Sequence, residues 1–315
     1  MTLEIKPTNE SELVVTEGAE NSAASIPPAP KRDLYKRTID RILVKLANSV
    51  EADCHHPYLE DNEVGAHDLS LDNSGNLLAV AIDLKASFKE NAYIPCPQNL
   101  LTITPDGEFD LEPKAKFTGC AVMIGHRQLR QIARDRQGKH EIFITTDYAT
   151  GAFLLEETGS PAVVAVRTCN MAKVHAILKS LFPKANIVVC LNFETNKHRM
   201  RKKTVAEIRS SGGVAIVPRF TLKERFNGLI SFNDLAMFHQ NRDRVIEIIL
   251  NLIQYGQEHH EQTAEKAPGT SAKASVAAKN PAKSPKSASA KTSKTATAHK
   301  SKPRKSSACR QEVNI

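Results

Sequence analysis

The chain has 315 residues and a net charge of +8, with 41% hydrophobic residues, 5% aromatic residues and no tryptophan. This length suits one large domain or two small ones with tails, and the hydrophobic content suffices for a buried core. No apolar run reaches the roughly 18 residues of a membrane-spanning helix, so we expect no membrane partner.

Charge is distributed unevenly, and both ends of the chain predict disordered tails. Residues 1–30 contain five glutamates and one lysine, whereas residues 261–315 contain twelve lysines and arginines against three glutamates. We predict a disordered acidic tail over 1–30 and a disordered basic tail, rich in Lys, Ala, Ser and Pro, over 257–315. A flexible polycation binds phosphate backbones, so Lys302, Arg304 and Lys305 predict DNA or RNA as a partner. The alternative is a solubilising tail without a partner.

The region between the tails begins with a predicted helix and a β-rich segment. Apolar residues recur at helical spacing from Leu34 to Leu46, which predicts a helix within residues 31–52. From residue 69 to residue 125, short apolar runs alternate with turn sequences such as DNSGN and TPDGE, as is typical of strands. We therefore predict a small β-rich module over residues 53–138.

The cysteines and histidines of this region predict no zinc site. The residues considered as zinc ligands are Cys54, His55, His56, Cys96, Cys120 and His126. Their spacing fits no standard zinc pattern, and two adjacent side chains seldom face one metal. We expect no zinc, with buried thiols and a structural His56 instead. No CxxC pair and no signal-peptide pattern occur, which favours a reducing cytosol.

Residues 139–256 alternate between short apolar strands and amphipathic helices. The strands are EIFIT, PAVVAV, NIVVCL and VAIVP, and Asn170 is placed to cap the helix after the second strand. Such alternation predicts a parallel sheet flanked by helices. In sheets of this kind, sites form in the loops after the carboxyl ends of the strands.

Several motifs, taken in order, resemble the Toprim domain of the DNA primases of plasmids, conjugative elements and satellite phages. They are HPYL at 56–59, TDYAT at 146–150, TGSPAVVAVRTCNM at 158–171, PKANIVVCLNFE at 183–194 and FNDL at 232–235. The resemblance implies an α/β fold: a Toprim-like parallel sheet flanked by helices and preceded by the small β-rich module.

The metal positions depart from the family pattern. The resemblance implies magnesium held by one glutamate and two aspartates, and the matching residues here are Thr146, Asn192 and Glu194. Magnesium prefers anionic oxygen ligands, so we expect it to bind weakly. Glu194 and Asp147 are the candidate catalytic residues, and Asp234 is a third candidate metal ligand. Capping of the following helix is the alternative role for Asp234.

A cluster of cations follows the third strand of this region. Its members are Lys197, Arg199, Arg201, Lys202 and Lys203. Cations at the start of a helix oppose the helix dipole, at a cost of about 0.3–1 kcal/mol each, unless an anion neutralises them. The cluster therefore predicts binding of nucleic-acid phosphates, and a solvated loop is the alternative.

These features together predict a primase-derived, nucleic-acid-binding protein of a mobile element, with catalysis lost or reduced. One alternative is an active, magnesium-dependent DNA primase that makes RNA primers for plasmid or phage replication. Another is an interaction or exported protein that uses the fold as a scaffold. Replication or conjugation proteins are expected as partners. We expect the bacterial cytoplasm as its location, with export to another cell as the alternative.

Overall fold

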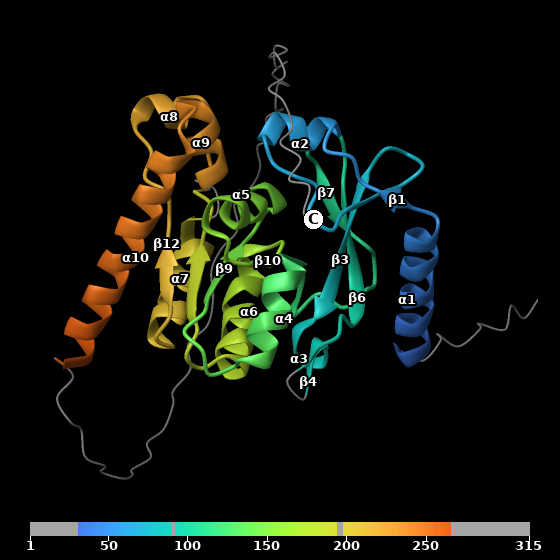
Figure 1. Ribbon diagram of the computed structural model, residues 1–315, viewed down its shortest axis with the longest axis horizontal. Coiled ribbons are helices and arrows are strands. Elements are labelled where there is room, and N and C mark those ends of the chain that lie inside the picture. Colours follow the sequence, from blue (N-terminus) through green and yellow to red (C-terminus); the bar gives the residue numbers. More distant parts are fainter. Residues whose placement is uncertain (1–30, 90–91, 194–197, 266–315) are drawn as a thin grey trace, which may run out of the picture.

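The structure is a computed structural model and describes residues 31–89, 92–193 and 198–265. Within these ranges ten strands form one mixed sheet in the order β1-β2-β3-β8-β10-β9-β11-β12, with β6 and β7 attached through β3. The sheet passes without a break from the predicted β-rich module into the predicted Toprim-like region (Figure 1).

The N-terminal half of the sheet is antiparallel. Its strands are β1 (Val50–Glu51), β2 (Ser70–Leu71), β3 (Leu77–Asp83), β6 (Pro97–Ile103), β7 (Phe109–Leu111) and β8 (Cys120–Ile124). A separate pair, β4 (Phe88–Lys89) and β5 (Ala92–Tyr93), lies beyond the end of β3. The expected DNSGN turn joins β2 to β3, where Oδ1 of Asp72 accepts from the N–H groups of Ser74 and Asn76.

The C-terminal half is parallel, as predicted. Its strands are β9 (Glu141–Thr145), β10 (Ala162–Val164), β11 (Asn186–Cys190) and β12 (Val214–Ile216). Strand β9 lies between β10 and β11, and β12 pairs with β11. Strand β10 also pairs antiparallel with β8, which joins the two halves. The predicted mixed α/β class, with a β-rich N-terminal part, is confirmed.

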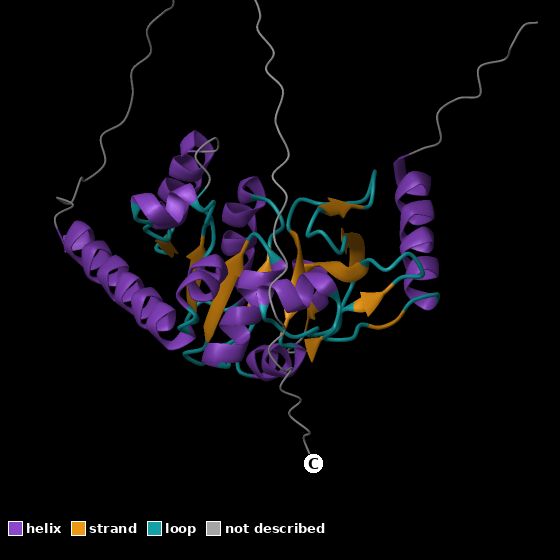
Figure 2. Cartoon of the chain, turned by 90° about the horizontal axis from the view of Figure 1, so that it is seen from above, coloured by secondary structure: helices purple, strands orange, loops and turns teal. Residues whose placement is uncertain are grey.

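Helices cover both faces of the parallel strands (Figure 2). One face packs against α2 (Pro57–Asn62), α5 (Tyr148–Thr158), α9 (Phe232–His239) and α10 (Arg242–Glu265). The other packs against α3 (Leu84–Ser87), α4 (His126–Arg134), α6 (Thr168–Leu181) and α7 (His198–Ser210). Alternate strand residues, such as Phe143 and Ile144, enter opposite cores because strand side chains alternate between faces.

Two predicted boundaries differ from the structure. The first helix, α1 (Lys31–Ala47), ends before residue 52, and β1 follows it. Of the apolar residues of α1, Ile42 is fully buried against Leu78 and Leu100, whereas Leu43 is 48% exposed. At the other end, α10 continues to Glu265, beyond the start of the predicted tail at residue 257. Within the described residues, no helix is long and apolar enough to cross a membrane.

Asn170 does not cap α6, contrary to the sequence prediction. Helix α6 begins at Thr168, and its N-cap is Arg167, which precedes Asn170 in the sequence. The Asn170 amide is buried and instead joins two loops: Oδ1 accepts from Gly119 N–H, and Nδ2 donates to the carbonyls of Cys120 and Ala165. The prediction failed because two of the partners of Asn170, Gly119 and Cys120, come from a distant part of the chain.

The HPYL segment ties the N-terminal half to the parallel sheet. His56 is buried, with Nε2 at 2.9 Å from the carbonyl of Gly75 and Nδ1 accepting from Tyr58 N–H. The Tyr58 hydroxyl accepts from the N–H of Ala149 in the first turn of α5. In return, the Tyr148 hydroxyl donates to the carbonyl of His67. These bonds hold the start of α5 at the end of β9.

Candidate functional site

The strand order places a topological switch point between β9 and β11. After β9 the chain crosses to β10 on one side, and it later returns to β11 on the other side. Ligands of open α/β sheets bind where the strand order reverses, beyond the carboxyl ends of the strands. Thr146 and Asp147 follow β9 and Asn192 follows β11, so these residues meet at this edge, as the sequence predicted.

Asp147 is fixed by the protein itself. It is the N-cap of α5, in an extended backbone conformation, and its Oδ1 accepts from Thr150 N–H at 2.7 Å. Its Oδ2 accepts from Nδ2 of Asn192 at 3.0 Å. Burial raises the pKa of Asp147, and the bonds from Thr150 and Asn192 oppose this rise. Both carboxylate oxygens therefore already have partners within the protein.

The space beside Asp147 is almost filled. Thr146 is buried, and its Oγ1 has no hydrogen-bond partner among the described residues. The cavity that Thr146 and Asp147 line with Tyr58 and Val166 has a volume of about 10 Å³, room for about one water molecule. Val166 has a φ of 63°, which is strained for a β-branched residue. This cavity is too small for a nucleotide.

Asp234 also has a capping role. In α9 the N-cap is Ser231, and Asp234 forms the reciprocal half of a capping box. Its Oδ2 accepts from the N–H groups of Ile230 and Ser231 at 2.8 and 2.9 Å. The structure thus gives Asp234 the alternative role that the sequence suggested. The other candidate ligand, Glu194, lies outside the described residues.

One member of the predicted basic cluster packs on an aromatic side chain. Arg199, Arg201, Lys202 and Lys203 lie in the first turns of α7, and Lys197 lies outside the described residues. The Arg201 guanidinium stacks on the ring of Phe193, with its central carbon 4.7 Å from the ring centroid. Phe193 follows Asn192, so the cations border the carboxyl edge of β11.

Sequence reasoning missed a second group of cations near Phe193. It comes from α8 (Leu222–Phe226), where the Arg225 guanidinium lies 4.8 Å from the Phe193 centroid. Lys223 lies over the ring of Phe238. Two exposed apolar side chains, Leu222 at 85% and Phe226 at 95%, extend from the same helix. The sequence signal was the alternation of basic and apolar residues in TLKERF.

We call this region the α7–α8 surface and define it as the exposed and half-buried side chains of residues 198–230, with Arg201 among the half-buried ones. That segment contains eight lysines and arginines against two glutamates. One of these glutamates, Glu224, is buried, accepts from Thr221 N–H and pairs with His239. The surface is therefore strongly cationic, and few anions within the segment offset it.

The residues considered for zinc separate into two groups. The described residues form no group of three ligands that includes His56, Cys96, Cys120 or His126. His56 has the structural role described above. Nδ1 of His126 is hydrogen bonded to the Tyr93 hydroxyl. Cys54 and His55, however, lie close together with Asp53. The assumption that adjacent side chains would not face one point is wrong for this turn.

Lys302, Arg304 and Lys305 lie outside the described residues, so the predicted contact of the tail with nucleic acid stays a prediction.

Comparison with known proteins finds only partial likenesses at low sequence identity. No family model and no curated protein matches the sequence. Among solved structures, the chain resembles DNA primase catalytic domains. The primase fragment of the bacteriophage T7 primase-helicase is 13% identical with a TM-score of 0.37, and the match covers 57% of this chain and 64% of that fragment. The chain therefore spans less than two thirds of that fragment.

Two further structures give similar values. One contains primase domains of bacteriophage T7 bound to an RNA/DNA hybrid (13% identity, TM-score 0.32, 55% of this chain and 80% of that chain). The other is the DnaG primase catalytic domain bound to single-stranded DNA (11% identity, TM-score 0.31, 77% of this chain and 93% of that chain). These are partial likenesses, so the functional argument rests on the residues of this chain alone.

Proposed function

We propose that this chain is a nucleic-acid-binding protein, derived from a primase of a mobile element, that no longer transfers nucleotides at the switch point. We call the sheet edge formed there by Thr146, Asp147 and Asn192 the Thr146 edge. The observation that carries the proposal is the α7–α8 surface, where Arg201 and Arg225 both stack on Phe193 beside the switch point. The order of the sequence motifs supports the descent from plasmid and phage primases.

The cations of this surface suit a phosphate backbone. Arginine stacks on aromatic rings and still offers N–H donors in its plane, which match phosphate oxygens. The two guanidiniums over Phe193 are thus pre-ordered, and exposed Lys202, Lys203 and Lys223 add charge around them. Such a surface attracts DNA or RNA without base recognition, because the contacts go to phosphates.

The carboxylates near the switch point favour loss of catalysis. Metal-assisted phosphoryl transfer needs acidic oxygens that can hold magnesium. Asp147 and Asp234 bond to backbone and side-chain donors instead, and Thr146 and Asn192 are neutral. Oriented N–H donors are not easily replaced by a cation, so these residues suit a structural role better than a metal site. Residual binding of magnesium would be weak.

The binding proposal is tested by the salt dependence of affinity for labelled DNA and RNA. Changing Arg201 and Arg225 together to Ala should weaken binding and lower the slope of log affinity against log salt by about 1.4–1.8, because two phosphate contacts are lost. The matched control changes Lys36 and Arg37, exposed in α1 at the other end of the molecule (Figure 1), to Ala. Equal slopes for both double variants would contradict the proposed surface.

Two further measurements complete the test. A chain shortened after residue 265 should lose part of its non-specific affinity, since the tail carries most of the net charge. A primer-synthesis assay on single-stranded DNA with magnesium should give no product above background. Primer synthesis that Asp147→Asn abolishes would instead establish the enzyme as active.

A further inference from the structure

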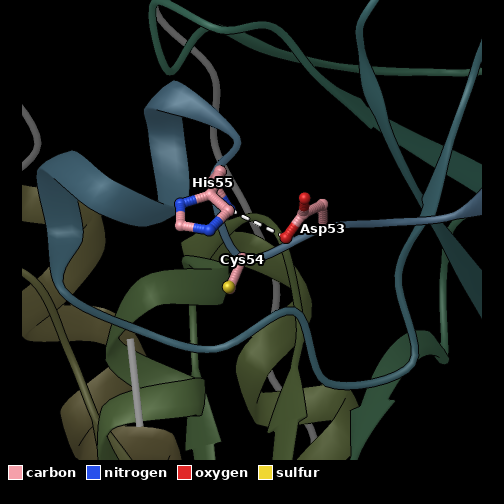
Figure 3. Close-up of side chains that lie close together, drawn as sticks. All are labelled: Asp53, Cys54 and His55. Atoms are coloured by element: carbon pink, nitrogen blue, oxygen red, sulfur yellow. Dashed lines mark hydrogen bonds between the residues drawn. The ribbon is translucent and has the colours of Figure 1, made fainter. Parts of the chain in front are cut away.

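A turn on the opposite side of Tyr58 from the switch point gathers three different metal-binding side chains. Asp53, Cys54 and His55 precede α2, and their ligand atoms all lie within 4.8 Å of one another. Figure 3 shows the three side chains side by side, with a dashed line for the bond from His55 N–H to Oδ1 of Asp53 (3.2 Å). None of the three is fully buried, so an ion can reach them from solvent.

The next residue explains why three consecutive side chains can converge. The ring of His56 is held on both nitrogens, by the Gly75 carbonyl and by the N–H of Tyr58. It thus turns inward and anchors the chain, while its three predecessors stay at the surface of a tight turn. The backbone bond from His56 N–H to the Asp53 carbonyl (3.2 Å) closes this turn. The geometry is set by the fold and does not require a metal to form.

A carboxylate orients the imidazole from the opposite side. Oε1 of Glu60, in the first turn of α2, lies 3.0 Å from Nδ1 of His55. Metal-binding histidines commonly have one ring nitrogen bonded to a carboxylate, which fixes the ring and makes the other nitrogen a better ligand.

We propose that Asp53, Cys54 and His55 bind a zinc-like divalent transition-metal ion, with Glu60 positioning His55 and solvent at the fourth position. A mixed set of sulfur, nitrogen and oxygen ligands selects zinc or cobalt over magnesium, which takes oxygen ligands. In a tetrahedral zinc site neighbouring ligand atoms are about 3.3–3.6 Å apart, as follows from bonds of ~2.0–2.3 Å. Small rotations of exposed side chains are enough to close the turn from 4.8 Å to this spacing.

This inference replaces the sequence-based expectation of no zinc. It does not depend on the proposed nucleic-acid function, because the turn is separate from the α7–α8 surface. Binding releases the Cys54 proton, and the ion then ties the chain before α2 to the helix through His55 and Glu60. The expected consequence is a native state stabilised by the ion through mass action.

Cobalt(II) absorption tests the site, with the metal ion alone as the probe and the full-length protein as the sample. The wild type should bind one cobalt ion that shows thiolate-to-metal charge transfer, and zinc should displace it. Cys54→Ser should abolish this absorption. The matched control is Cys169→Ser, which removes an exposed thiol from α6 and should leave the absorption unchanged.

Two other variants separate ligands from their surroundings. His55→Ala should weaken zinc binding more than Glu60→Gln does, and Glu60→Gln should weaken it by about 10- to 100-fold, the range for loss of a residue that orients a ligand. Melting of each metal-free variant checks that it folds. The proposal is overturned if the wild type shows no thiolate-to-cobalt absorption, or if that absorption survives Cys54→Ser.

Discussion

The Thr146 edge and the α7–α8 surface differ in whether their charged groups are bonded within the protein. At the edge, the buried Asp147 carboxylate is bonded to Thr150 and Asn192, and Asp234 is bonded to two backbone N–H groups. On the α7–α8 surface, the cations stack on aromatic rings or extend into solvent. The carboxylates of the edge thus take part in the hydrogen bonds of the fold, whereas most cations of the surface are exposed.

The difference teaches how a site can change its role without loss of the fold. A cluster of carboxylates without a cation raises the pKa values of its members and destabilises the native state. Neutral Thr146 and Asn192 remove that repulsion and provide a donor for Asp147. Exposed cations cost little because water screens them, so the surface can remain charged.

The largest expected effect comes from restoring acids at the edge. Thr146→Glu with Asn192→Asp adds two carboxylates beside Asp147 and removes the donor to its Oδ2. We expect the metal-free variant to lose about 3–5 kcal/mol of unfolding free energy, the range for an uncompensated buried charge. Magnesium should restore part of this loss, about 2.7 kcal/mol at 100 times its Kd.

The measurement is denaturant unfolding at several magnesium concentrations, with Thr146→Gln and Asn192→Gln as the neutral control. Wild-type stability should not respond to millimolar magnesium. A wild type that melts several degrees higher in magnesium would show that this edge still holds a metal, and the contrast between the two regions would disappear.

A smaller effect, dependent on pH, is expected for Asp147→Asn. Burial raises the pKa of Asp147 above its ordinary value, so the folded state disfavours the charged form. As pH rises from 4 toward neutrality, the wild type loses this part of its stability, while the variant does not. The stability of the variant relative to the wild type should therefore increase with pH, and a constant difference in unfolding free energy from pH 4 to pH 7 would contradict it.

Thr146→Val should stabilise the protein by about 1 kcal/mol. The buried Oγ1 has no partner among the described residues, and replacing an unpaired hydroxyl by a methyl group removes a desolvation cost. Thermal unfolding of the variant is the measurement. A loss of stability in Thr146→Val would indicate a bond to the hydroxyl.

The smallest effect on stability is expected on the α7–α8 surface. Phe226→Ser removes a ring that is 95% exposed, and its unfolding free energy should change by less than about 0.5 kcal/mol. Phe220→Ser is the contrasting variant, because Phe220 is buried against Phe193 and its loss should cost about 3–5 kcal/mol. Similar losses in both variants would mean that Phe226 is part of the core.

Much of the architecture could be predicted from local patterns. Continuous apolar strands such as β11 and amphipathic helices such as α6 are features of short segments, and each appears in the structure close to its predicted place. The convergence of Thr146, Asp147 and Asn192 was also predictable, because parallel strands bring their carboxyl ends to one edge. The partners of single polar side chains, such as Asn170, were not.

The amino-acid sequence by itself determined the class of fold, the neutral Thr146 and Asn192 after β9 and β11, and the cationic charge after β11. Only the tertiary structure decided that Asp147 is held by Asn192, that Arg225 joins Arg201 on Phe193, and that Asp53, Cys54 and His55 share one turn. The physical reason is the separation along the sequence of the residues that interact. Periodicity and charge are properties of neighbouring residues, whereas hydrogen bonds and stacking depend on which distant segments the packed core brings within a few ångströms.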